Sequence, residues 1–165
     1  MYFKVACMQG SSGVPGFNSA LAQCSEPSQG QWASTTCTAG SYAAQGSDTV
    51  LSTSSYALPG QFVAAHTVSG TSALLGSDAQ IGHCTKPECP TAGKCNYVSA
   101  ACTAGSELDS GSLGSDTSIQ SCSSSQSGKY VRQACVTGKH NQQGQDTILE
   151  VCSNPGLDEI VLGAC

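Results

Sequence analysis

The eleven cysteines of this 165-residue chain carry its clearest chemistry. Thiols pair as disulfides in oxidising compartments, whereas in reducing ones cysteines more often bind metal or catalyse reactions. A zinc site would have to come from the cluster His83, Cys84, Cys89, Cys95 and Cys102. Successive cysteines of that cluster are 5, 6 and 7 residues apart and form no paired C-x-x-C knuckles. We therefore favour disulfides and predict no metal or other cofactor.

The other groups that could do chemistry are sparse. A G-x-D motif supplies about one aspartate per repeat, whereas calcium requires about 6–8 oxygens with several carboxylates close together. We expect these aspartates to cap turns, because a short carboxylate accepts hydrogen bonds from nearby backbone. His66, His83 and His140 have no recurring partners and no G-x-S-x-G motif occurs. The sequence therefore predicts no enzyme.

The cysteines belong to a repeat of fixed register. Each unit has a first anchor with an aromatic or aliphatic residue five positions before it, and a second anchor that follows a G-x-D/N motif. The first anchors are Cys7, Cys37, Thr67, Cys102, Cys135 and Cys165. The second anchors are Cys24, Ser54, Cys84, Cys122 and Cys152. The units cover 2–31, 32–61, 62–96, 97–129 and 130–159, with a partial sixth unit over 160–165, in one array spanning 1–165.

Composition and pattern favour an all-β fold. Only 5% of the residues are aromatic, which is poor material for one large core. Each unit has two short segments of strand character, typified by YVSAACTA and DTSIQSC, bounded by Gly and Asp turn signals. No window has a sustained helical period. We predict an elongated array of about five small two-strand repeats of roughly 30 residues, held together by disulfides.

The positions without cysteine indicate how the cysteines pair. If each unit closed on itself, Cys37 would face Ser54 and Cys84 would face Thr67, which leaves two thiols unpaired. If the second anchor of one unit joins the first anchor of the next, Ser54 faces Thr67 and no thiol is orphaned. We therefore predict the inter-unit bonds Cys24–Cys37, Cys84–Cys102, Cys122–Cys135 and Cys152–Cys165.

An insertion in the third unit leaves the pairing there open. It adds Cys89 and Cys95, which can bridge each other, although Cys84–Cys89 with Cys95–Cys102 is a competing arrangement. Cys7 has no preceding unit and is expected to be unpaired or intersubunit. Because the chain opens and closes at equivalent points of the repeat, we expect either further repeats of a longer chain or copies joined head to tail.

Two surface features have alternative interpretations. The recurring aromatics, Tyr2, Trp32, Phe62, Tyr97 and Tyr130, would form a carbohydrate-binding ladder or, as we favour, pack over the disulfide or against the recurring Leu or Ile. Runs of Ser and Thr such as 34–36 and 121–125 suit O-linked glycans as well as they suit plain polar loops.

Charge and hydropathy exclude two classes of partner. The net charge is −5 without a basic cluster, so we expect no nucleic-acid partner. No apolar run approaches the length of about 18 residues that a membrane span needs, so we expect no membrane-spanning segment.

The phrase YVSAACTAG…GSDTSIQSC followed by GKYVRQACVTG resembles tandem cysteine-rich repeats in surface proteins of microbial eukaryotes. It is also distantly similar to tumour-necrosis-factor-receptor-type modules, but has two cysteines per unit instead of about six and lacks C-x-x-C. The resemblance covers all five units and implies an elongated extracellular rod of stacked modules. It supplies no catalytic residues.

The sequence thus predicts a structural protein of the cell exterior, a subunit or segment of a surface filament or appendage. The alternative is the ectodomain of an adhesin or receptor that binds a protein or glycan, with the insertion over 85–94 as its binding surface.

Overall fold

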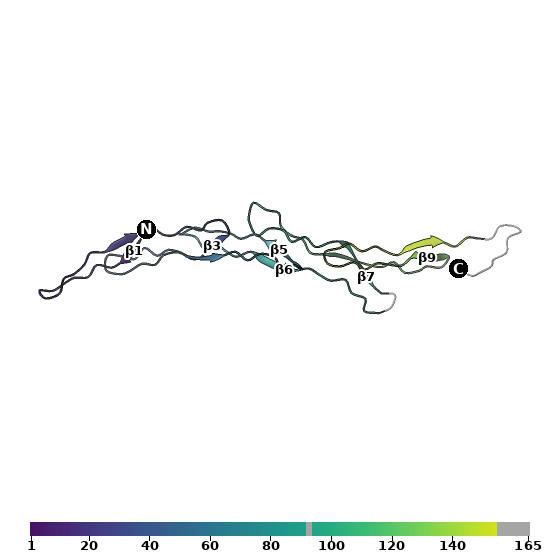
Figure 1. Cartoon of the computed structure of the whole chain (residues 1–165), viewed down its shortest axis with the longest axis horizontal. Helices are drawn as coiled ribbons and strands as arrows, with labels where there is room; N and C mark the ends of the chain where they lie inside the picture. Colours follow the sequence, from purple (N-terminus) through teal and green to yellow (C-terminus); the bar gives the residue numbers. More distant parts are fainter. Residues whose placement is uncertain (92–93, 155–165) are drawn as a thin grey trace. The chain divides into compact units, whose positions relative to one another are not determined.

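The computed structural model describes residues 1–91 and 94–154. They form five two-stranded sheets and no helix (Figure 1). The predicted all-β array of small hairpins held by disulfides is confirmed. The sheets pair β1 (Tyr2–Val5) with β2 (Ala20–Ala22), β3 (Gln31–Thr35) with β4 (Val50–Thr53), β5 (Gln61–Ala65) with β6 (Gln80–His83), β7 (Asn96–Ala100) with β8 (Ser118–Ser121), and β9 (Lys129–Gln133) with β10 (Ile148–Val151).

The chain divides into two compact units that interleave in sequence. The first contains Met1–Leu58, Val63–Gly82 and Gly105–Gly114, and the second contains Pro59–Phe62, His83–Ala104 and the described residues from Ser115 onward. We call the successive hairpins repeats one to five.

A narrow loop joins the two strands of each hairpin. In repeat two it is a ladder of two bridges, Thr38 with Ser47 and Ser41 with Ala44. Gly40 lies in this loop with φ +68°, and a Cβ there would lie 2.4 Å from the Gly46 nitrogen. Only glycine fits that close approach in a left-handed conformation, which explains why the glycine three residues after the anchor recurs. We call this segment the inter-strand loop; its copies are 8–17, 38–47, 68–77, 103–115 and 136–145.

In repeats two, three and four the residue directly after the recurring aromatic is fully buried. Ala33, Val63 and Val98 are fully buried, each at the centre of its strand. Across the hairpin, Ala33 is paired with Leu51 and Val98 with Ile119. The recurring Leu or Ile therefore faces this buried position.

The aromatic side chains lie on the other face of the hairpin, because successive residues of a strand point to opposite sides. Trp32 is paired with Ser52, and Tyr97 with Gln120, whose side chain accepts a hydrogen bond of 2.7 Å from the Tyr97 hydroxyl. The prediction that the aromatics pack against the recurring Leu or Ile is wrong. In repeats one, two, four and five, the residue that directly follows the aromatic is paired with the recurring Leu or Ile instead.

Candidate functional site

The junction between successive repeats is where the recurring polar and sulfur chemistry gathers. We call each junction a joint and name it by its two anchors. The disulfide Cys24–Cys37 joins the second strand segment of repeat one to the first strand segment of repeat two, with 5.9 Å between the Cα atoms. Cys84–Cys102 and Cys122–Cys135 join later repeats with the same Cα separation. These are the pairs that the sequence register predicts.

Backbone hydrogen bonds form a second layer of each joint. The Ala33 N–H of repeat two donates to Ser69 O at 2.9 Å, and its C=O accepts from Gly76 N at 2.9 Å. Both partners lie in the inter-strand loop of repeat three. Val98 of repeat four bonds Thr137 and Gly144 of repeat five in the same way. The first strands of repeats two and four are thus covered by the inter-strand loop of the following repeat, and this is why Ala33 and Val98 are fully buried.

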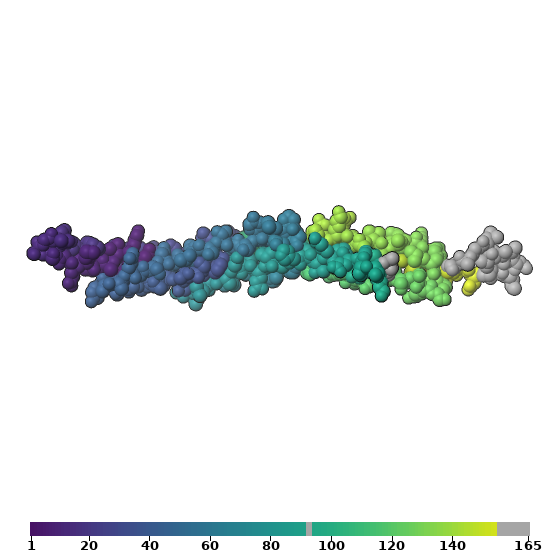
Figure 2. All heavy atoms as spheres, turned by 90° about the horizontal axis from the view of Figure 1, so that it is seen from below, coloured from purple at the N-terminus to yellow at the C-terminus, as the bar shows by residue number. Residues whose placement is uncertain are grey.

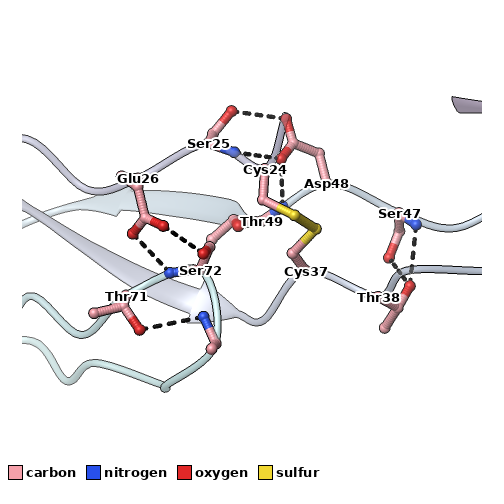
Figure 3. Close-up of a disulfide and its surroundings, with 11 residues drawn as sticks. Cys24, Ser25, Glu26, Cys37, Thr38, Ser47, Asp48, Thr49, Thr71 and Ser72 are labelled. Carbon is pink, nitrogen blue, oxygen red and sulfur yellow. Dashed lines mark hydrogen bonds between the residues drawn. A yellow bond between two sulfur atoms is a disulfide. The ribbon is translucent and has the colours of Figure 1, made fainter. Parts of the chain in front are cut away.

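The recurring aspartate is the third layer. Asp48 of repeat two accepts hydrogen bonds from the N–H and the hydroxyl of Ser25, both at 2.7 Å, and from the Thr49 N–H at 2.8 Å (Figure 3). Ser25 directly follows Cys24, so the carboxylate clasps the chain beside the disulfide. The aspartates were expected to cap turns. They do bind the next N–H, but their other two bonds reach back to the preceding repeat.

The same clasp recurs at every described joint after the first. The pairs of donor and acceptor residues are Ser55 with Asp78, Thr85 with Asp116, and Ser123 with Asp146. Repeat one has Asn18 at this position, and among the described residues its side chain accepts a hydrogen bond only from the Ser19 N–H. Charge-assisted hydrogen bonds to a carboxylate are stronger than neutral ones, so the clasp depends on the ionised aspartate.

The hydrogen bonds of the clasp shift the acid strength of these carboxyl groups. The N–H and then the hydroxyl of Ser25 lower the pKa of Asp48, and those of Ser123 lower the pKa of Asp146. The hydroxyl of Thr85, followed by its N–H, lowers the pKa of Asp116. At Asp78, desolvation raises the pKa, but the bonds from Ser55 outweigh it and the net shift is downward.

Glu26 extends the first joint to a third repeat. Its carboxylate accepts from the Ser72 N–H at 2.8 Å and from the Ser72 hydroxyl (Figure 3). The side-chain bond, and then the backbone bond, from Ser72 lower the pKa of Glu26. The Ser72 C=O also accepts from the Cys37 N–H at 2.8 Å. Residues of repeats one, two and three therefore meet around the disulfide Cys24–Cys37.

The joint between repeats two and three has no disulfide. Ser54 and Thr67 occupy the anchor positions and are both buried, with exposed fractions of 8% and 7%. Their backbones keep the bonds of the cysteine joints, since Ser54 N donates to Gly30 O as Cys84 N donates to Gly60 O. Neither hydroxyl has a hydrogen-bond partner in the described part of the chain. The cysteine geometry is therefore retained without the sulfurs.

The insertion of repeat three carries its own disulfide, Cys89–Cys95, with 4.1 Å between the Cα atoms. The competing arrangement of Cys84 with Cys89 and Cys95 with Cys102 is not observed. The Asn96 N–H donates to Glu88 O at 3.0 Å, so the disulfide closes a small loop beside the start of β7. Residues 92 and 93 of the insertion lie outside the described residues.

Cys7 and Cys152 differ in their bonding state. Cys7 is a free, exposed thiol. Cys152 is disulfide-bonded, and its predicted partner Cys165 lies outside the described residues. Residues 160–165, the predicted partial sixth unit, lie there too.

Within residues 1–91 and 94–154, no three His, Cys, Asp or Glu side chains are placed to hold a metal ion. The cysteines near His83 are in disulfides. The His66 ring bonds Leu108 O at 2.8 Å, a contact within the first compact unit.

Sequence reasoning missed the hydroxyl half of the clasp. A Ser or Thr follows the second anchor in every repeat, as Ser25, Ser55, Thr85, Ser123 and Ser153. This recurrence was the available signal, but in a chain so rich in Ser and Thr it does not stand out. Its meaning depends on the 23-residue separation between Ser25 and Asp48, which only the folded joint explains.

Comparison with known proteins identifies no relative. No protein-family model matches the chain, and neither a curated protein nor a solved structure is significantly similar to it. In the described part of the chain there is no helix long and apolar enough to cross a membrane. The disulfides are of the kind that form and persist in oxidising compartments.

Proposed function

We propose that this chain is a structural protein of the cell exterior, a subunit or segment of a surface filament built from hairpin repeats. The observation that carries the proposal is the placement of the disulfides. Cys24–Cys37, Cys84–Cys102 and Cys122–Cys135 each tie one repeat to the next instead of closing a repeat on itself. Bonds placed in this way transmit load from one repeat to the next.

The other two layers of the joint support the same function. Inter-strand loops cover the preceding strands, and the clasp from Asp48 to Ser25 recurs from Asp146 to Ser123. Each repeat buries little apolar surface of its own, since the fully buried side chains are single residues such as Val63 and Val98. Stability therefore resides in contacts between neighbours, as in other repeat arrays. Ser and Thr runs would carry O-linked glycans in that setting.

Electron microscopy of the purified protein under oxidising conditions tests this function. A filament subunit forms particles that lengthen as the protein concentration rises. Short particles of uniform length that do not lengthen would contradict it.

The insertion favours a second function, the ectodomain of an adhesin or receptor. Its additional disulfide Cys89–Cys95 rigidifies a segment that the other repeats lack. Deleting residues 86–94 with the substitution Cys95→Ser should abolish binding of a protein or glycan to the intact array while leaving the joint disulfides in place. Binding that survives the deletion would count against this second function.

A further inference from the structure

Cys95 occupies a position that is glycine in the neighbouring repeats. From repeat two onward, the N–H of each second anchor donates to the C=O of the residue opposite it across the hairpin. In repeats two, three and five the accepting residues are Gly30, Gly60 and Gly128, all with positive φ. In repeat four the accepting residue is Cys95. Of these four described pairs, only that of repeat four places one cysteine opposite another.

The backbone of Cys95 and Cys122 already has the separation that a disulfide requires. The last pair of the β7–β8 ladder is Asn96 with Ser121. Their outer neighbours, Cys95 and Cys122, are the next opposite pair, and the Cys122 N–H donates to Cys95 O at 2.9 Å. Directly opposite residues in an antiparallel pair have Cα atoms about 4.5–5.5 Å apart and side chains on one face. A disulfide needs about 4.4–6.8 Å between its Cα atoms.

Both cysteines are bonded elsewhere, so two disulfides lie side by side. Cys95 is bonded to Cys89, and Cys122 to Cys135. One hollow of about 400 Å³ is lined by Cys95, Cys122 and Cys135 together. In the space-filling view the teal segment that contains the insertion lies against green residues that follow it in the chain (Figure 2). Cys89 is exposed, so a soluble thiol can reach the disulfide of the insertion first.

We propose that Cys95 is an exchange thiol, through which a small soluble thiol that reduces Cys89–Cys95 also opens the joint disulfide Cys122–Cys135. The thiolate of the reductant attacks Cys89 Sγ, the Cys89–Cys95 bond breaks, and Cys95 leaves as a thiolate. Cys95 Sγ then attacks Cys122 Sγ, so that a Cys95–Cys122 disulfide forms and Cys135 leaves as a thiolate.

A second thiol of the reductant completes the reaction. It attacks the reductant sulfur of the mixed disulfide at Cys89, forms the disulfide of the reductant and releases the Cys89 thiolate. Two reductant thiols are thus oxidised to one disulfide. In the protein, two disulfides become one, Cys95–Cys122, and the thiolates of Cys89 and Cys135 take up the two protons.

The surroundings of Cys95 favour this exchange over exchange at the preceding joint. Lys94 lies in a hollow of about 350 Å³ that Cys95 and Cys122 also line. A cation beside a thiolate stabilises it, and the thiolate is the attacking species. Cys84 of the joint Cys84–Cys102 is buried and has Gly60 opposite it. That joint therefore lacks an internal thiol and is expected to stay intact.

The exchange would leave the joint between repeats four and five in the state of the Ser54–Thr67 joint. The clasp from Asp146 to Ser123 and the backbone bonds of Val98 to the following loop remain. The new disulfide joins the two strands of repeat four instead of two repeats. This redox switch goes beyond the proposed function, because it concerns the strength of one joint whether or not copies form filaments.

The matched variants Cys89→Ser and Cys95→Ser test the exchange without a reductant. Each leaves one free thiol in the insertion, and both also carry Cys7→Ser because Cys7 is a free thiol. After incubation at pH 8, free thiols are labelled with N-ethylmaleimide and located by mass spectrometry. In Cys89→Ser we expect Cys95 and Cys135 to share the label to within roughly tenfold, since one thiol replaces another of the same kind.

In Cys95→Ser we expect the label on Cys89 alone, because Cys89 is not opposite Cys122. Label confined to Cys95 in the Cys89→Ser variant would overturn the proposal. Labelling of Cys135 to the same extent in both variants would also overturn it, since the exchange would then not depend on the position of Cys95. Either result leaves the proposed function standing.

A second measurement keeps all four cysteines. The oxidised chain with Cys7→Ser alone receives one equivalent of dithiothreitol, which carries both thiols, and is then labelled. Trypsin and chymotrypsin place Cys95 in peptide 95–97, Cys122 in 114–129 and Cys135 in 133–139. We expect 95–97 linked to 114–129, label on 133–139, and an intact Cys24–Cys37 bond as the internal control. Label on Cys89 and Cys95, with 114–129 still linked to 133–139, would contradict the exchange.

Discussion

The Cys24–Cys37 and Ser54–Thr67 joints have the same backbone architecture and differ in their covalent chemistry. Both keep the loop-to-strand hydrogen bonds and the aspartate clasp. One closes a 13-residue segment with a disulfide, and the other buries two hydroxyl groups without partners. Because the second joint still forms, the hydrogen bonds and the covered strand are sufficient to position neighbouring repeats. The disulfide adds stability to a geometry that does not depend on it.

The largest expected effect comes from converting the first joint into the second. The double substitution Cys24→Ser and Cys37→Thr removes the disulfide and should lower the free energy of local unfolding by about 3 kcal/mol. Hydrogen exchange at the amide of position 37, which donates to Ser72 O, measures this opening. Exchange at the Val98 amide in the second compact unit is the internal control and should not change.

The reverse conversion should have a somewhat smaller effect of opposite sign. Ser54→Cys with Thr67→Cys should form a disulfide in air and stabilise the joint by up to about 3 kcal/mol, since introduced disulfides often deliver less than the chain-entropy value. Thiol titration of the folded protein, compared with the wild type, counts the new bond. Two additional free thiols would show that the anchors of this joint do not have the cysteine geometry.

The covered and uncovered strands give a third contrast. Val98→Ala removes two methyl groups from a fully buried position and should destabilise its hairpin by about 2 kcal/mol. Val131→Ala, in a dilute sample, should cost less than about 0.5 kcal/mol because Val131 is half-exposed. Hydrogen exchange within the β7 and β9 hairpins reports both values, and equal losses would contradict the burial difference.

The clasp provides the smallest single effect. Asp78→Ala should destabilise the Ser54–Thr67 joint by about 1 kcal/mol or less, since the carboxylate is largely exposed. Asp48→Ala is the matched control, and its effect should be smaller because the Cys24–Cys37 disulfide holds that joint. A larger loss of joint stability for Asp48→Ala than for Asp78→Ala would show that the Cys24–Cys37 disulfide does not help to hold its joint.

Acid should weaken all the clasps together. The pKa values of Asp48, Asp78, Asp116 and Asp146 are lowered by folding. Such groups stabilise the fold above their unfolded pKa, and this stability is lost as the pH falls through the lower folded values. Thermal stability should therefore be level above about pH 5 and fall below about pH 4. Stability that rises on acidification would contradict the clasp.

The sequence predicted the hairpins and the disulfides, because their residues recur at fixed positions in each repeat. The hairpins were predicted from strand segments that lie between glycine turns. The pairing of the cysteines was predicted because Ser54 and Thr67, the two anchor positions without cysteine, face each other when the bonds join successive repeats. The position of the core was not predictable in the same way. Trp32 is larger than Ala33, yet Ala33 is the buried residue, because the loop of the following repeat covers its face of the strand. That covering is a contact between repeats, and strand periodicity does not reveal it.

The central claim is that disulfides join successive repeats, and a map of non-reduced peptides tests it most directly. After cleavage with trypsin, Cys135 lies in the short peptide 133–139, while Cys95, Cys102 and Cys122 lie together in 95–129. Further cleavage with chymotrypsin after Leu108 and Leu113 separates Cys102 from Cys122. The structure predicts that peptide 133–139 is recovered linked to the fragment that contains Cys122. Recovery of Cys122 linked to Cys102, with peptide 133–139 free, would contradict the account.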